Sequence, residues 1–397
     1  MSFENPASII KSFNIQGSFS NASITQDRLV PGKWERVRQP FTRTFRESNL
    51  PTNVDWGVTH SYFLPESLRV VGSIFVEITL PALGNGNYKE CPGLYAIQEQ
   101  RFMSAGTESY KVNPALMLRE YVSSLSNEEA DQFCRTYLGK KDAVDGSARV
   151  ILVPLFLPNS HYFHRDQKVK KSYGAFPAYL GQNRLECQLS FAAAASMVQS
   201  GADAPATVAN AIKVLVHQVE MQPTAVNRYS DARGAYSVIN KRFTELTTGW
   251  TNYASAGSLE KLTQIQPIGT CVQLLVQAVP AGTADANKEI LTCVPASFIE
   301  VVADSITQRS LGSAHKVAME LYSNGFVHNN VANNCSRISF SAHGSDDGIW
   351  SGGFAMQLNS QINLHLKFDQ AVDYRVYAVQ YQRITINSIG LVQSTLE

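Results

Sequence analysis

The sequence has few charged side chains and no long apolar run, and both shortages limit what the protein can be. Asp, Glu, Lys and Arg make up 17% of its 397 residues, against roughly 25% in typical soluble proteins. The formal net charge of +1 gives no general reason to bind nucleic acid or an anionic membrane. The longest apolar stretches, Val150–Pro158 and Phe191–Val198, are too short to span a bilayer.

So little charge on so long a chain has two explanations. Copies of the chain cover much of one another's surface, or the many Ser, Thr, Asn and Gln residues keep the surface polar without charge. The composition favours assembly and leaves the second explanation open. The chain is too long for one ordinary core, and a hydrophobic share of 44% can fill two. We therefore expect two domains.

The cysteines are too far apart in the sequence for a zinc site. They are Cys91, Cys134, Cys187, Cys271, Cys293 and Cys335. Zinc sites need pairs separated by two to four residues. Met1–Asn21 lacks the basic start and the apolar run of a signal peptide. We predict six free thiols, no metal site and synthesis in a reducing cytoplasm.

Motifs of the common enzyme classes are also missing. The sequence contains no Gly-x-Ser-x-Gly, no His-Glu-x-x-His, no phosphate-binding loop and no His-x-His of the cupin type. Gly84-Asn85-Gly86 follows a predicted strand, but no apolar helix opens after it, so we interpret it as a turn. We predict no catalytic residue, no cofactor and no enzymatic activity.

Two polar loops could still bind a cation. His161, His164 and Asp166 could hold a metal if their loop folded back on itself, but the neighbouring Lys168–Lys171 favours a solvated loop. Three lysines without interleaved aromatic residues are also a weak signal for nucleic acid. His343–Gly348 resembles a calcium loop but lacks the alternating acidic positions of an EF-hand, so a tight turn is favoured.

Strand patterns dominate both halves. Arg184–Phe191 and Ile362–Phe368 alternate apolar and polar residues, which places every apolar side chain on one face of a strand. Further strands are expected at Val70–Leu80, Arg149–Pro158, 212–217, Cys271–Val279, Glu289–Val294, Arg337–Ala342, Gly353–Leu358 and Tyr374–Ile386. We predict two all-β domains with one-sided cores, arranged as a sandwich or jelly roll.

Helical spacing is confined to short segments. Ala115–Leu125 and Glu128–Leu138 are predicted helices, with a capping box from Ser126 to Glu129 opening the second. Tyr236–Leu246 is predicted as a third. The predicted divisions are an N-terminal arm at 1–32, which we expect to order against a partner, a first domain at 33–200 and a second at 201–397.

Several blocks, in order, resemble the double jelly-roll major capsid proteins of tailless icosahedral DNA viruses. The blocks are Tyr95–Pro114 with the helix that follows, Val153–Phe156, Phe176–Leu180 running into Asn183–Phe191, Pro267–Val279, Ile349–Met356, and Val376–Ile386 with Gly390. Their succession carries the resemblance, which covers most of residues 33–393. Gln380 stands where that family often has Asn.

The resemblance implies two consecutive eight-stranded jelly rolls with short helical insertions. It also implies a pseudo-hexameric homotrimer that tiles an icosahedral shell in the virion, with minor capsid or penton proteins and an internal membrane as further partners and no specific nucleic acid. The arm would lie at the base of the trimer.

Two other classes stay open. A glycan-binding or spike protein could use loops Tyr229–Tyr236 and Asn324–Asn334. A hydrolase could use carboxylates among Glu186, Asp346 and Asp347.

Overall fold

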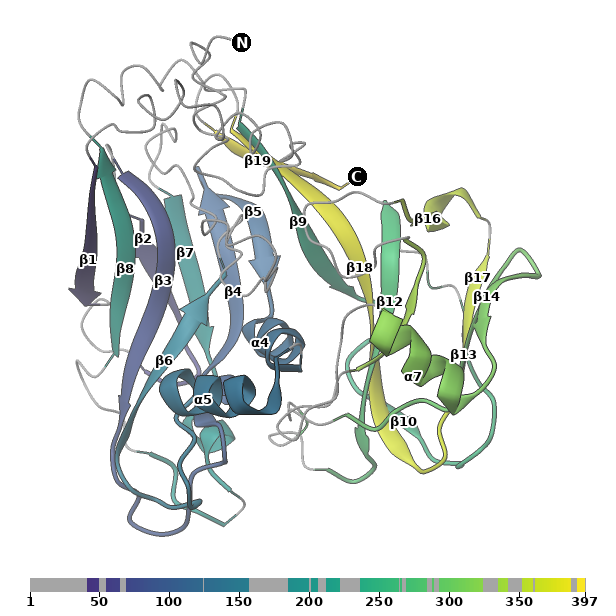
Figure 1. Cartoon of the computed structure of the whole chain (residues 1–397), viewed down its shortest axis with the longest axis horizontal. Helices are drawn as coiled ribbons and strands as arrows, with labels where there is room; N and C mark the ends of the chain where they lie inside the picture. Colours follow the sequence, from purple (N-terminus) through teal and green to yellow (C-terminus); the bar gives the residue numbers. More distant parts are fainter. Residues whose placement is uncertain are drawn as a thin grey trace. The chain divides into compact units, whose positions relative to one another are not determined.

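The computed structural model describes residues 41–49, 55–64, 69–123, 125–156, 185–199, 201–205, 212–221, 236–263, 265, 269–283, 288, 293–323, 335–341, 352–359, 361–386 and 391–396 (Figure 1). The strands in these ranges form four sheets, and the chain divides into two compact units. The arm predicted for 1–32 lies outside the described residues.

The first eight strands form two antiparallel sheets of four. They are β1 (Phe41–Asn49), β2 (Thr59–Phe63), β3 (Arg69–Leu80), β4 (Ile97–Ser104), β5 (Thr107–Val112), β6 (Arg149–Leu155), β7 (Leu185–Phe191) and β8 (Ile212–Met221). One sheet has the order β1-β8-β3-β6 and the other β2-β7-β4-β5. The chain crosses repeatedly between the sheets, which is the connectivity of a jelly roll.

The later strands repeat this order. They are β9 (Tyr236–Glu245), β10 (Thr251–Tyr253), β11 (Glu260–Leu262), β12 (Thr270–Pro280), β13 (Phe298–Ala303), β14 (Ile306–Leu311), β15 (Ser336–Ser339), β16 (Phe354–Ala355), β17 (Ile362–Lys367), β18 (Val372–Ile386) and β19 (Val392–Leu396). The sheets run β10-β18-β12-β15 and β11-β17-β13-β14, with β16 added to β12 and with β9 and β19 added to β18. Matching orders in both halves describe two consecutive jelly rolls.

The place where the first jelly roll ends differs from the boundary predicted after residue 200. Strand β8 was expected to open the second domain, yet it pairs with both β1 and β3. The first compact unit consists of Met1–Ala115, Cys134–Asn240 and Arg383–Thr395, so it includes β8. A strand that closes a jelly roll has the same alternation as one that opens the next, so local pattern does not distinguish the two roles.

The two helices predicted in the first half are confirmed as α4 (Pro114–Ser123) and α5 (Asn127–Tyr137). The Glu129 carboxylate accepts from the Ser126 backbone N–H at 3.2 Å, which is the carboxylate half of a capping box, and it also accepts from the Ser126 hydroxyl at 2.6 Å. The second compact unit includes Leu116–Phe133 together with Lys241–Gln382.

Two helix assignments differ from expectation. The prediction of a helix at Tyr236–Leu246 is wrong, because this segment forms strand β9, which pairs with β18. Its apolar residues have helical spacing, but pairing with a long neighbouring strand outweighs that preference. Helix α7 (Ala314–Ser323) was missed, although Val317 and Leu321 form a short buried stripe. Short 3-10 turns occur at η1 (Pro92–Tyr95), η3 (Ala194–Met197) and η5 (Met356–Leu358).

The one-sided strand pattern is confirmed where the alternation is strict. Along β7 every second residue is buried, beginning with Leu185, and β17 shows the same pattern from Ile362. The predicted strand at Glu289–Val294 lies mostly outside the described residues. None of the helices in the described ranges reaches the length and apolarity that a membrane-spanning helix requires.

Candidate functional site

Most of the polar loops singled out in the sequence lie outside the described residues. This holds for His161, His164 and Asp166, for Lys168–Lys171, for His343–Gly348 with Asp346 and Asp347, and for Asn324–Asn334. Among the residues that the structure does describe, no three His, Cys, Asp or Glu side chains gather as metal ligands would.

The glycine-rich segment at Gly84–Gly86 is a bend that no α-helix follows; the next helical element is the short 3-10 turn η1. Gly86 has a φ of 84°, and a Cβ at that position would lie 2.3 Å from the Ala202 Cβ. Both the left-handed backbone and the close approach require glycine. The segment is therefore a turn, as predicted.

Glu186, the candidate acid on β7, lies on the outer face of the β2-β7-β4-β5 sheet. It accepts hydrogen bonds from the Ser61 hydroxyl and, at 2.9 Å, from the Gln188 amide. These donors hold the carboxylate within a cross-strand polar network. The neighbouring Thr59 and Ser190 hydroxyls also pair, at 2.8 Å. Such pairs stabilise a sheet surface.

The same outer face carries an ion-pair ladder on β4 and β5. Glu99 pairs with Arg101 and, at 2.5 Å, with Lys111. Burial alone would raise the pKa of Glu99, but hydrogen bonds from Lys111 and Arg101 outweigh it and lower the pKa. This face is therefore polar and charged, and the charges of Glu99, Arg101 and Lys111 are paired with one another.

The corresponding sheet of the second jelly roll, β11-β17-β13-β14, has a mixed outer face. Glu300 on β13 lies opposite His365 on β17, with 3.0 Å between Oε2 and Nδ1. One pair further along, the Lys367 ammonium lies 5.4 Å from the centre of the Phe298 ring. All four residues are half-buried, so aromatic and charged groups share this surface.

The other sheet of the second jelly roll hides its outer face. Nine consecutive residues of β12, Cys271–Val279, are buried, although a strand with one solvated face would alternate. Leu274 and Val276 belong to the core between the sheets. Leu275 instead belongs to a second cluster with Leu116 of α4 and Tyr377 of β18.

This hidden face also holds a cluster of polar groups, all buried except the half-buried Glu120, which we call the polar seam: Arg119, Glu120, Gln273, Arg337, Cys293 and Cys335. Arg337 is 1% exposed and lies 2.7 Å from Glu120. Its Nη1 also donates to the Gln273 side chain at 3.3 Å. A buried ion pair of this kind is costly to break, because removal of one partner leaves the other charge buried.

A buried carboxylate, Glu320, attaches helix α7 to the sheets. Glu320 accepts hydrogen bonds from Arg309 at 2.7 Å and from the backbone N–H of Ser339 on β15 at 2.8 Å. Arg309 donates to the Ser339 carbonyl as well. These bonds tie β14, β15 and α7 together.

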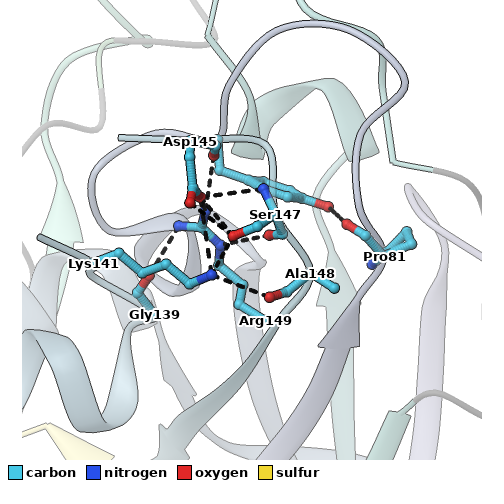
Figure 2. A network of polar contacts seen from close by, with 8 residues as sticks. Pro81, Gly139, Lys141, Asp145, Ser147, Ala148 and Arg149 are labelled. Atoms are coloured by element: carbon cyan, nitrogen blue, oxygen red, sulfur yellow. Dashed lines mark hydrogen bonds and ion pairs between the residues drawn. The ribbon is translucent and has the colours of Figure 1, made fainter. Parts of the chain in front are cut away.

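In the first unit, a network at the start of β6 orders the loop that precedes it (Figure 2). The buried Arg149 guanidinium donates to the carbonyls of Gly139 at 3.1 Å and Asp145 at 2.8 Å, and it pairs with the Asp145 carboxylate. Ser147 donates to Asp145 and accepts from Lys141. The Ser147 hydrogen bond lowers the pKa of Asp145.

The Ser147, Lys141 and Asp145 side chains superficially suggest a nucleophile with a base. Lys141 acts as a donor to Ser147 and to the Ala148 carbonyl, at 3.2 Å for the latter, and the Ser147 proton is held by a carboxylate whose lowered pKa makes it a weak base. The arrangement stabilises a loop and does not activate a hydroxyl.

Sequence reasoning missed the polar seam. Arg119 and Glu120 fall in a predicted helix, and Arg337 opens a predicted strand, where each is ordinarily assigned to solvent. One signal was available. The unbroken apolar run Leu274–Val276 in a predicted antiparallel sheet indicates a strand buried on both faces.

This fold can be compared with those of known proteins. No protein-family model matches the sequence, and no curated protein matches it. Solved structures do. The chain is similar to VP54 of PBCV-1, with a TM-score of 0.65 and 15% identity over 90% of this chain and 97% of that one.

Two further structures show the same likeness. The Faustovirus major capsid protein has a TM-score of 0.60 at 8% identity, covering 89% of this chain and 94% of its own. The major capsid protein of STIV has 0.54 at 11%, covering 86% and 96%. These neighbours are double jelly-roll capsid proteins, and the predicted all-β double jelly-roll fold is confirmed.

Proposed function

We propose that this chain is a major capsid protein, which forms pseudo-hexameric homotrimers that tile an icosahedral virus shell. The observation that carries the proposal is the repeated strand order, β1-β8-β3-β6 with β2-β7-β4-β5 and then β10-β18-β12-β15 with β11-β17-β13-β14. Two barrels in one chain give three chains six similar barrels around one axis. The fold shared with three capsid proteins supports the same conclusion.

The surfaces agree with a building block whose flanks are covered. The outer sheet face of the first unit carries paired charges such as Glu99 and Lys111, and that of the second mixes Phe298 with Lys367. Interfaces combine aromatic and polar groups in this way. An obligate trimer of this kind buries more than roughly 2,000 Å² per contact, which accounts for the low share of charged residues.

The remaining roles are part of the same proposal. The protein acts without catalysis or cofactor, is made in the host cytoplasm and ends in the virion. Its first partner is itself. Minor capsid or penton proteins and a membrane beneath the shell are further partners, and the arm at 1–32 clamps neighbouring subunits or meets the membrane.

The test is the mass and outline of the purified full chain. Light scattering at micromolar concentration should give three times the 43.7 kDa of one chain, without added metal, and electron micrographs should show a pseudo-hexagonal particle. A folded monomer that cannot be driven to assemble would overturn the proposal. Selective, saturable binding on a glycan array by such a monomer would favour the glycan-binding class instead.

A further inference from the structure

Two thiols meet inside the polar seam of the second unit. The Sγ atoms of Cys293 and Cys335 lie 3.1 Å apart, although 42 positions separate the residues in the sequence. Both side chains are buried, at 5% and 0% exposure. The bond length of a disulfide is about 2.05 Å, so a movement of about 1 Å separates this contact from a covalent link.

A buried cation lies beside the pair. Arg119, which is fully buried, directs its Nη1 to Cys335 Sγ at 3.6 Å. A guanidinium next to a thiol favours the thiolate, which is the reactive form of cysteine. The hydrogen bond from the Cys335 thiol lowers the pKa of Cys293, while burial raises the pKa of Cys335. One proton is thus held on Cys335, and Cys293 is the nucleophile.

The other cysteines provide a comparison within the same chain. Cys187 and Cys271 are buried strand residues whose thiol pKa is raised by burial. Cys91 is hydrogen-bonded to Cys134, and this bond raises the pKa of the Cys91 thiol. The cation that opposes the rise is Lys140, which also pairs with Glu90 at 2.8 Å. Cys91 therefore has a weaker tendency than Cys293 to form a thiolate.

We propose that Cys293 and Cys335 form a redox-active pair that a peroxide converts to a disulfide. The Cys293 thiolate attacks one peroxide oxygen, the O–O bond breaks, and the departing hydroxide takes up a proton to become water. This leaves a sulfenic acid on Cys293. Cys335 then attacks the Cys293 sulfur, the S–S bond forms, and the hydroxyl leaves with the Cys335 proton as a second water. Two electrons pass from the thiols to the peroxide.

The link would fasten the buried face of the β12-β18 sheet. Cys335 directly precedes β15, and the backbone N–H of Val294, next to Cys293, bonds to the Ala278 carbonyl of β12 at 2.8 Å. Closing a loop of this length in the unfolded chain favours the folded state. The oxidised protein should melt on the order of 10 °C higher than the reduced one, and dithiothreitol should reverse the shift.

The experiment is peptide mapping of the folded full chain after treatment with hydrogen peroxide. Remaining thiols are alkylated under denaturing conditions and the peptides are identified by mass spectrometry. We expect a Cys293–Cys335 linked peptide as the main product, a fall from six alkylated cysteines to four, and full alkylation of Cys187 and Cys271. The Cys91–Cys134 link should form more slowly.

Three variants sharpen the result. Cys335→Ala should abolish the link and the melting shift and should leave Cys293 as sulfenic or sulfinic acid. Cys271→Ala, a buried cysteine of the same unit, should change neither. Arg119→Met should slow the reaction by about tenfold, as a rise of one pKa unit in the thiol requires, and near-ultraviolet circular dichroism checks that it folds.

Six alkylated cysteines after treatment, or links in equal yield among unrelated cysteines, would overturn the proposal from the wild-type chain alone. A sulfinic acid on Cys293 without any link to Cys335 would do the same. The assembly test above reads mass rather than thiols, so either proposal can fail without the other.

Discussion

Two sheets with the same strand order differ in what covers them. In the β1-β8-β3-β6 sheet, strand β8 alternates buried and half-buried residues over 212–216, and β3 does the same over 74–78 before an exposed Thr79. In the matching β10-β18-β12-β15 sheet, Cys271–Val279 is buried throughout. Leu116 packs against the outer face of that second sheet. One connectivity therefore serves both a one-sided and a two-sided sheet.

The segment that covers the second sheet is distant from that sheet in the sequence. Leu116–Phe133 stands between β5 and β6 of the first jelly roll, yet it belongs to the second compact unit. It brings Arg119 and Glu120 to Cys335 and Arg337, at 3.6 and 2.7 Å. An insertion between two strands of the first jelly roll thus packs within the second compact unit.

The largest expected effect comes from the buried ion pair of this segment. Arg337→Met should lower the free energy of unfolding by about 3–5 kcal/mol, because the Glu120 carboxylate, 15% exposed, and the buried Gln273 side chain both lose the guanidinium. Replacing both residues, by Met and Leu, should recover most of the loss. Urea unfolding of both variants measures this.

The matched control is Arg101→Met in the first unit, whose side chain is 45% exposed in its pair with Glu99. Its cost should stay below about 1 kcal/mol. Equal costs for the Arg337 and Arg101 replacements would mean that the second sheet is not covered as described.

The next effect separates the two faces of each sheet. Leu274 and Leu275 belong to different buried clusters of the second unit. Replacing either leucine by alanine should leave a cavity and lower the free energy of unfolding by about 2–5 kcal/mol. In the first unit Ile78→Ala should cost a comparable amount, whereas Thr79→Ala on the exposed face should change stability by less than about 0.5 kcal/mol. A small effect at Leu275 would contradict the two-sided packing.

How much of this could be predicted depends on whether the cause is local. The alternation in β7 and β17 and the capping box at Ser126 are local patterns, and the structure confirms them. The strand β9 was mistaken for a helix because its partner β18 lies far along the chain. Pairing of that kind is a tertiary effect, and sequence windows do not contain it.

The candidate site shows the same limit. The Arg337–Glu120 pair joins residues 217 positions apart. Taken alone, an arginine or a glutamate is ordinarily assigned to the protein surface. The order of the sequence blocks along the chain did indicate the double jelly roll, because that order extends over both halves of the chain and does not depend on any one local pattern. The end of the first jelly roll at β8 did not follow from it, since closing and opening strands look alike.

The capping box tests how far the covering segment depends on its own helix. Ser126→Ala should lower the stability by about 1 kcal/mol, because the hydroxyl bond to the Glu129 carboxylate is lost while the bond from the backbone N–H of residue 126 stays. Glu129→Ala should cost a similar amount. Glu128→Ala, in the same first turn, changes the same charge without touching the cap and should cost a few tenths. Thermal melts of the three variants give the ranking.

The smallest effect is a pH dependence confined to the open face of the first unit. The pKa of Glu99 is lowered in the folded state, so its contribution to stability is complete above the unfolded pKa of about 4.3 and is lost as the pH falls through the folded value. Because Lys111 and Arg101 are both more than 40% exposed, this contribution is below about 1 kcal/mol and shrinks with salt. Glu99→Gln should flatten the stability curve below pH 5 at low ionic strength, and the Thr79→Ala variant, which changes no titratable group, should keep the wild-type slope there. If Glu99→Gln left the slope of stability against pH unchanged, the acid dependence would come from other carboxylates. The outer face of the first unit would then not be distinguished by a pH-dependent contribution.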